Sequence, residues 1–233
     1  MEIKQVMPYV GVRKLHYMLR QSLLESGYPI LGRDRLFDLL RERDMLVKRI
    51  RNYAITTDSN HPFKIYDNLI KTMNISRVNQ LWVSDITYVR VNHKFCYLSL
   101  VTDVFSRKIV GYHLNESLKL EGPLKALQMA LKEAKPEYHH SDRGSQYCSY
   151  RYTNELKKYN VKISMTQDGN CYDNAVAERV NGILKQEFDL SNTFKSKKEA
   201  NKLIKQAVHN YNFFRPHWGL DLKVPGDVYI YAA

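Results

Sequence analysis

Three carboxylates in this chain have the residue types and the spacing that divalent-metal chemistry requires. Asp85 interrupts an apolar stretch, Asp142 closes the run Tyr138–Asp142, and Glu178 lies where a helical pattern begins, with thirty-five residues between Asp142 and Glu178. Carboxylate oxygens are the ligands that Mg²⁺ prefers, and two ions about 4 Å apart suit in-line phosphoryl transfer. The three acids therefore predict a metal site that acts on phosphodiesters.

The charge of the chain indicates the kind of substrate. The formal net charge is +12, and the excess of Lys and Arg is shared between residues 1–78 and 79–233. A globular chain this basic typically meets a polyanion, with DNA or RNA as the leading choice. Charge alone leaves open a basic protein without such a partner. The hydrophobic content of 44% is sufficient for a sizeable core.

The cysteines and the apolar runs bound the cellular location. Cys96, Cys148 and Cys171 are far apart and form no CxxC pair, so we expect neither a zinc site nor a disulfide framework. Residues 1–20 carry charge throughout, unlike a signal peptide. Apolar runs in the sequence fall short of the roughly 20 residues that span a bilayer. These features predict a cytoplasmic protein.

Asp85 is expected on a mainly apolar strand face. Alternate residues of a strand share a face, so Asp85 lies with Val83 and Thr87. An unpaired carboxylate there would cost several kcal/mol or take up a proton. A bound cation offsets that cost. Two other solutions stay open at this point: a buried Arg partner, or a sheet margin that is open to water.

Asp142 ends a short predicted strand and precedes Arg143. Functional groups gather at the carboxyl ends of strands in open α/β sheets. An ordinary turn aspartate is the alternative. His139 and His140 are adjacent in the same strand and point to opposite faces, so we interpret them as structural residues. Arg143 is a predicted contact to the DNA backbone.

Helical phase selects Glu178 among its acidic neighbours. Glu187 is nine positions further, about half a turn out of phase at ~100° per residue, so the two cannot share a site. Lys185 is seven positions further and shares the face of Glu178, which predicts a carboxylate for metal and an ammonium for phosphate on one helix. Asp173 is the expected N-cap of this helix.

The pattern of elements predicts an α/β fold with a mixed five-stranded sheet and flanking helices. Aromatic and β-branched runs predict strands, and apolar residues at helical spacing predict helices. The predicted strands cover residues 81–91, 94–102, 108–114, 137–140 and 161–165. The predicted helices cover residues 120–135, 150–159, 172–188 and 197–213.

The first part of the chain reads as a separate small helical unit. Residues 1–55 contain two amphipathic helices around a break at Gly27–Pro29, and Arg33 and Arg35 lead the second helix. This arrangement predicts a helix-turn-helix-like DNA-binding region. A helical hairpin with solvated arginines is the alternative. We expect a linker over 56–78 and a catalytic core with a C-terminal helix and tail over 79–233.

Three segments together carry a family pattern: Trp82–Val89 (WVSDITYV), His139–Tyr147 (HHSDRGSQY) and Gly169–Phe188 (GNCYDNAVAERVNGILKQEF). The chain resembles the integrase-like transposases of bacterial insertion sequences, in particular the second-reading-frame product of the group related to retroviral integrases. The resemblance extends through Gly11–Arg20 and Tyr211–His217 and covers nearly the whole chain.

The resemblance implies a ribonuclease-H-like fold with Asp85, Asp142 and Glu178 as a catalytic, metal-binding acid triad, and Lys185 in the family's basic position. It implies Mg²⁺ or Mn²⁺, with two ions, in cleavage of transposon ends and strand transfer into target DNA. It also implies a homo-oligomer on DNA in the nucleoid of a bacterium and, as a partner, the product of an upstream reading frame. A metal-dependent nuclease or resolvase of the same fold and a non-catalytic DNA-binding regulator are the alternatives.

Overall fold

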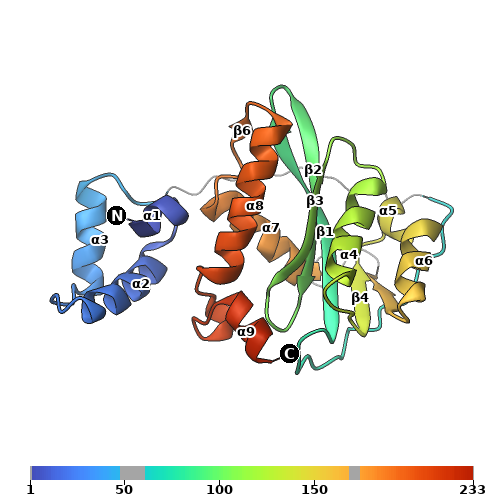
Figure 1. Ribbon diagram of the computed structural model, residues 1–233, viewed down its shortest axis with the longest axis horizontal. Helices are drawn as coiled ribbons and strands as arrows, with labels where there is room; N and C mark the ends of the chain where they lie inside the picture. The colour runs from blue at the N-terminus through green and yellow to red at the C-terminus, as the bar shows by residue number, and fades with distance from the viewer. Residues whose placement is uncertain (1, 48–60, 168–173, 233) are drawn as a thin grey trace.

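The computed structural model describes residues 2–47, 61–167 and 174–232, and its centre is a mixed sheet with strand order β3-β2-β1-β4-β5 (Figure 1). The strands are β1 (Leu81–Val91), β2 (Lys94–Asp103), β3 (Ile109–Asn115), β4 (Tyr138–Ser141) and β5 (Lys162–Met165). β1, β2 and β3 form an antiparallel meander, whereas β1, β4 and β5 run parallel. The predicted five-stranded mixed sheet is confirmed.

A short sixth strand, β6 (Thr193–Phe194), extends this sheet beyond the prediction. It pairs in parallel with the end of β1, where Arg90 lies opposite Thr193. Two residues are too few to show a strand period, so the sequence carried no signal for β6. Among the described residues, no strand pairs with this edge of β1 between β4 and β6, because β4 pairs with residues 81–83 of β1 and β6 with residues 90–91.

Helices cover both faces of the sheet (Figure 1). One face carries α4 (Glu121–Leu131), α5 (Ser145–Cys148) and α6 (Tyr150–Lys158), and the other carries α7 (Ala175–Glu187) and α8 (Lys197–Phe213). Trp82 and Ile86 of β1 pack in the first layer, whereas Val83 and Val89 pack toward α7 and α8. The predicted alternation along β1, which puts Asp85 on the α7 side, is therefore correct.

The N-terminal helices share a core with the sheet domain. They are α1 (Glu2–Val6), α2 (Val12–Glu25) and α3 (Arg33–Glu42), and α1 and α2 lie on the α8 side (Figure 1). Leu15 and Leu36 are buried in the same cluster as Ile204 of α8. The side-chain amide of Asn210 donates to the Val6 carbonyl at 3.0 Å. Contacts of this kind fix the helical unit against α8.

The chain ends in a compact turn and helix that the prediction treated as a tail. The 3-10 helix η2 (Trp218–Leu220) is followed by α9 (Pro225–Tyr231), which packs on α8. In the ranges that the structure describes, no helix has both the length and the apolarity that a bilayer crossing demands.

Candidate active site

Strand register places the two aspartates side by side. β1 and β4 are parallel, with Val83 opposite His140, and two further steps along both chains bring Asp142 beside Asp85. β4 ends at Ser141, so Asp142 occupies the carboxyl end of its strand, as predicted. The Gly144 N–H donates to Asp142 Oδ1 at 2.9 Å. A Cβ at residue 144 would lie 2.9 Å from Gln146 Oε1 and 3.0 Å from Asp142 Oδ1, so a larger residue would crowd this carboxylate.

Helix α7 brings Glu178 to the aspartates from across the sheet. The Asn174 amide donates to the Ser84 carbonyl at 3.0 Å, and the Asn181 amide donates to Asp85 Oδ2 at 2.7 Å. These two bonds tie the first half of α7 to the part of β1 that carries Asp85. Glu178 lies between them in the first turn of α7, exposed, and has no hydrogen bond or ion pair with another described residue.

Burial and the two neighbouring acids change the protonation of Asp85. Burial, then the neighbouring Asp142, and then Glu178 raise the pKa of Asp85 to about 7, despite hydrogen bonds from the Ile86 N–H and Asn181 that favour the carboxylate. Mutual repulsion of this kind requires the three groups to be close. The structure thus brings together all three residues that the sequence singled out.

The acids do not form a closed ligand set. Among residues 2–47, 61–167 and 174–232, no three His, Cys, Asp or Glu side chains are positioned to hold an ion as they stand. Asp85 and Asp142 are fixed by hydrogen bonds, whereas Glu178 is free to change rotamer. An all-oxygen donor set with unbalanced negative charge fits a hard divalent cation. Asp173, the predicted N-cap, lies outside the described residues.

Lys185 lies on the same side of α7 as the acids. Its Nζ is 3.7 Å from the centre of the Tyr88 ring. Burial lowers the pKa of Lys185, and the negative charge of Asp85 opposes that shift, which places the ammonium near the acid cluster. A hollow of about 130 Å³ beside it is lined by Tyr88, Arg90 and Lys185 among others. A phosphate could therefore reach Lys185 next to the acids.

The other predicted DNA contacts, Arg143, Arg33 and Arg35, lie in two different places. Arg143 directly follows Asp142 in the chain. Its side-chain Nε donates to the Thr166 carbonyl at 2.6 Å. Arg33 pairs with Asp34 at 2.9 Å on the surface of α3, and Arg35 is exposed on the same helix. The structure places Arg143 next to the acids, whereas Arg33 and Arg35 belong to the separate N-terminal unit.

Two residues of the site were missed from the sequence, Asn181 and Tyr88. Asn181 is three positions after Glu178 and so shares its face of the helix. This spacing in the sequence could have predicted it. Tyr88 points to the opposite side of β1 from Asp85, so strand alternation gave no reason to include it. Lys185 meets the Tyr88 ring where the edge of β1 is open between β4 and β6.

The two histidines of β4 are held inside the core on opposite sides, in agreement with their interpretation as structural residues. A His139 ring nitrogen lies 2.7 Å from the Ser84 hydroxyl and 3.1 Å from the Tyr152 hydroxyl. Burial, with a smaller contribution from His140, lowers the pKa of His139 to about 3 and keeps the ring neutral. His140 bonds the Ser164 hydroxyl at 2.8 Å.

Glu187 occupies a different environment at the far end of α7. Lys14 of α2 contacts it at 2.8 Å, and Arg215 donates to both of its oxygens at 2.8 Å. Burial alone would raise the pKa of Glu187, but Arg215 and Lys14 outweigh burial and lower it. The acid excluded by helical phase is thus part of an ion-paired cluster.

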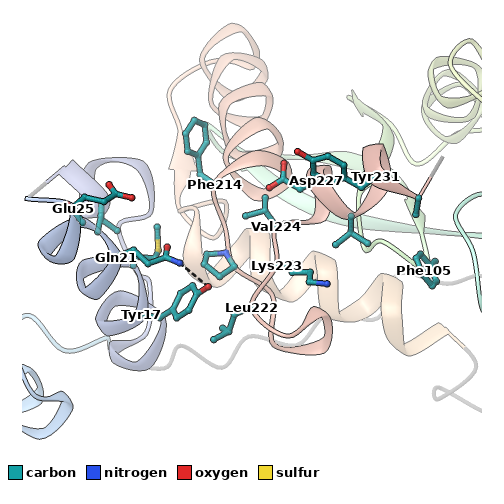
Figure 2. Close-up of a pocket in the computed structure, with 16 residues that line it drawn as sticks. Tyr17, Gln21, Glu25, Phe105, Phe214, Leu222, Lys223, Val224, Asp227 and Tyr231 are labelled. Atoms are coloured by element: carbon teal, nitrogen blue, oxygen red, sulfur yellow. Dashed lines mark hydrogen bonds between the residues drawn. The ribbon is translucent and has the colours of Figure 1, made fainter. Parts of the chain in front are cut away.

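A cavity of about 980 Å³ lies apart from the acids, between α2 and the C-terminal segment (Figure 2). Tyr17 and Gln21 of α2 form one wall and Leu222 and Val224 the other, and the Gln21 amide donates to the Tyr17 hydroxyl at 3.1 Å. Asp85, Asp142 and Glu178 are absent from its lining. This cavity is therefore separate from the acid cluster formed by the middle of β1, the end of β4 and the start of α7.

Comparison with known proteins agrees with this geometry. Two models of the integrase core domain match residues 75–171 and 159–225. The catalytic core of HTLV-2 integrase, solved in complex with magnesium, superposes with a TM-score of 0.53 at 19% identity, over 66% of this chain and 97% of the integrase chain. The simian T-cell lymphotropic virus intasome, in a complex with a PP2A regulatory subunit, gives a TM-score of 0.58 at 17% identity, over 94% and 74% of the two chains. The fold is that of an integrase catalytic core.

Closer relatives are bacterial. The uncharacterized 31 kDa protein of insertion element IS600 from Shigella sonnei is 40% identical over 204 residues, which span 85% of this chain and 75% of that protein. The transposase InsF for insertion sequence IS3A from Escherichia coli is 32% identical over 197 residues, 83% and 67% of the two chains. The chain belongs to the IS3-family insertion-sequence transposases, enzymes of the DDE polynucleotidyl transferase class with an integrase catalytic core.

Proposed function

We propose that Asp85, Asp142 and Glu178 are the catalytic residues and hold two Mg²⁺ (or Mn²⁺) ions during cleavage of transposon ends and strand transfer. The raised pKa of Asp85, about 7, is the observation that carries this proposal. A protein fold that assembles three acids without a cationic partner for Asp85 needs cations to offset their repulsion. The magnesium in the related HTLV-2 integrase core supports the choice of ion.

The chain's own residues prepare this site for a phosphodiester. The Ile86 N–H and the Asn181 amide hold both oxygens of Asp85, and the Gly144 N–H holds Asp142. Glu178 can then move to complete the ligand set, because described residues leave its carboxylate unpaired. When bound, the ions would activate a water or 3′-hydroxyl nucleophile and stabilise the leaving oxygen. Lys185 would hold a neighbouring phosphate.

Four basic residues are proposed to contact DNA. Lys185 and Arg143 lie beside the acids and would contact the donor strand, whereas Arg33 and Arg35 are exposed on α3 and would contact the duplex further away. We keep the proposed division into a helix-turn-helix-like unit over 1–55, a linker over 56–78 and the catalytic core over 79–233. The shared core of α2, α3 and α8 means that the first and third parts act as one body.

The working form of the enzyme is proposed to be a homo-oligomer on DNA in the bacterial cytoplasm, at the nucleoid. The related HTLV-2 core is described in dimeric and trimeric forms, and the simian viral relative as an intasome. The product of an upstream reading frame is proposed as a further partner.

The triad is tested by Asp85→Asn, Asp142→Asn and Glu178→Gln in a Mg²⁺-dependent strand-transfer assay. Each variant should lose at least about a thousandfold in joining rate, because a metal ligand supports several kcal/mol of transition-state stabilisation. DNA binding should stay close to that of the unmodified protein. Asp227→Asn, an exposed site on α9, is the matched control. Joining by Asp142→Asn at the unmodified rate would refute the proposed metal site.

The N-terminal contacts are tested by the double substitution Arg33→Gln with Arg35→Gln. Loss of two phosphate contacts should weaken binding to transposon ends and reduce the salt slope of the binding constant by about 0.9 per contact. The control is Lys125→Gln in α4 with Lys132→Gln directly after it, since α4 covers the other face of the sheet. Equal slopes for both double variants would mean that Arg33 and Arg35 are merely solvated.

A further inference from the structure

A basic cleft of about 600 Å³ separates the beginnings of α2 and α3 from α7 and the η2 turn. Its charged lining consists of Arg13, Lys14, Arg33 and Arg179, with the acids Asp34 and Glu187. Both acids are already neutralised, Asp34 by Arg33 and Glu187 by Lys14 and Arg215. Arg13 and Arg179 are exposed and pair with no other described residue. The cleft therefore carries an excess of positive charge.

One rim of the cleft displays an aromatic ring on a rigid support. Trp218 opens the η2 turn and is 53% exposed. The turn is closed by two backbone bonds of 3.0 Å, from the His217 N–H to the Lys223 carbonyl and from the Leu222 N–H to the His217 carbonyl. An indole held in this way loses little further conformational freedom when it stacks on a ligand.

The positive potential reaches the base of this turn. Burial, followed by Arg215, Arg107, Lys14 and Arg179, lowers the pKa of His217 to about 4. The cations of the cleft and of the neighbouring ion-paired cluster are thus close enough to act on the residue that precedes Trp218. The same positive potential would attract an anion that enters the cleft.

Helical phase connects the cleft to the acids. Arg179 follows Glu178 directly and points about 100° around α7 from it, whereas Glu187 points about 180° away. Arg179 therefore lies on the flank between the face of the acid triad and the face that carries the ion-paired cluster. A strand that leaves the acids around this flank passes Arg179 before it reaches Trp218.

We propose that this cleft binds the unpaired end of a DNA strand, with Arg13 and Arg179 on its phosphates and the Trp218 indole stacked on a base. The inference rests on the proposed function, since it assumes that DNA passes the acid triad. Bases inside a duplex cover one another's faces, so, apart from the outer face of a terminal pair, only an unpaired base offers a face to Trp218. A cleft of this volume admits a flexible strand and excludes a double helix.

Tryptophan fluorescence of the full chain gives a direct test. The chain has two tryptophans, and Trp82 is fully buried, so a change on DNA binding reports Trp218. Three DNAs are titrated in EDTA: a blunt duplex, the same duplex with a short unpaired 3′ thymidine extension, and the same extension without bases. We expect quenching by the thymidine extension alone, and its loss in Trp218→Phe.

Affinities separate stacking from phosphate binding. Trp218→Ala should bind the thymidine-extended duplex roughly 5- to 150-fold more weakly and the other two DNAs as the unmodified protein does. Arg13→Gln should weaken binding of both extended DNAs equally, because both keep the phosphates. Lys132→Gln, an exposed lysine on the far side of the sheet, is the control for loss of a charge.

Two results would overturn the inference while leaving the proposed function intact. One is DNA binding with the same Trp218 signal for blunt and extended duplexes. The other is a Trp218→Ala defect of equal size on all three DNAs, which would mean a structural role. Failure to bind any of the three DNAs would refute the proposed DNA function itself.

Discussion

Helix α7 carries two glutamates that point to opposite sides of the helix, into opposite electrostatic environments. Glu178 is exposed, has no partner among the described residues, and helps to raise the pKa of Asp85. Glu187 is buried against Lys14 and Arg215, and its pKa is lowered. One end of the helix therefore concentrates unbalanced negative charge, whereas the other end neutralises it.

Glu178 and Glu187 are the same residue type, so the partners of each side chain decide whether it is a reactive acid or a structural one. The paired carboxylate joins three segments, because Lys14 lies in α2 and Arg215 follows α8. The Glu178 carboxylate, which has no partner among the described residues, lies in the first turn of α7 on the side of Asp85 and Asp142. Stability and chemistry are thus divided between two faces of one helix, and substitutions should separate them.

The largest expected effect on stability is that of Glu187→Ala. It leaves Arg215, 1% exposed, and Lys14, 6% exposed, without their counter-charge, and removal of one partner of a buried pair costs about 3–5 kcal/mol. Denaturant unfolding measures the loss. Glu178→Gln is the matched control, with a change within about 0.5 kcal/mol. Equal unfolding free energies for the two variants would contradict the division of stability and chemistry between the two faces of α7.

Asp85→Asn should raise the free energy of unfolding, and the size of this gain should depend on pH. The folded-state pKa of Asp85 is about 7, above its ordinary 3.8, so the folded protein binds more protons between these values and loses stability as pH rises through them. The uncharged variant avoids this loss. We expect Asp85→Asn to be more stable than the unmodified protein by roughly 1–2 kcal/mol at pH 8 in EDTA, a gain typical of substitutions that remove a destabilising active-site charge. Near pH 4 the two proteins should be equally stable.

The amide can be accommodated, because Asn181 Oδ1 is buried without a partner and can turn to accept from it. Mg²⁺ should raise the unfolding free energy of the unmodified protein at pH 8 and leave that of Asp85→Asn unchanged. A variant that is less stable than the unmodified protein at pH 8 would mean that the acids do not repel as inferred.

The smallest effects are expected for two lysines: Lys185, near the acid triad, and Lys14, in the ion-paired cluster of Glu187. Lys185→Ala should weaken binding to transposon ends several-fold and lower the salt slope by about 0.9, with little loss of stability. Lys14→Ala should destabilise the fold and leave that slope unchanged, because Lys14 is already paired with Glu187. Filter binding at several salt concentrations and denaturant unfolding provide both numbers. Identical slopes for Lys185→Ala and the unmodified protein would remove Lys185 from the DNA contacts.

Much of the fold and site could be predicted because local patterns carried the information. The alternation along β1 gave the side on which Asp85 lies, and the phase of α7 excluded Glu187 and selected Lys185. Strand ends gave the position of Asp142. Each of these rules depends on residues close together in the sequence.

The rest depends on contacts between distant segments. The ion pairs of Glu187 with Lys14 and Arg215 join residues from opposite ends of the chain, and no periodicity encodes them. Tyr88 enters the site only because β4 and β6 leave an edge of β1 open. The sequence also gave no indication that α2 and α3 share a core with α8.

The cluster around Glu187 also has a consequence for synthesis on the ribosome. The Lys14–Glu187 pair spans 173 positions and the Val6–Asn210 bond spans 204, so α1 and α2 find their partners only after nearly the whole chain has emerged. Contacts of such long separation form late and slowly. A growing chain can therefore build its sheet first, and the N-terminal helices dock once Glu187 and Asn210 have emerged.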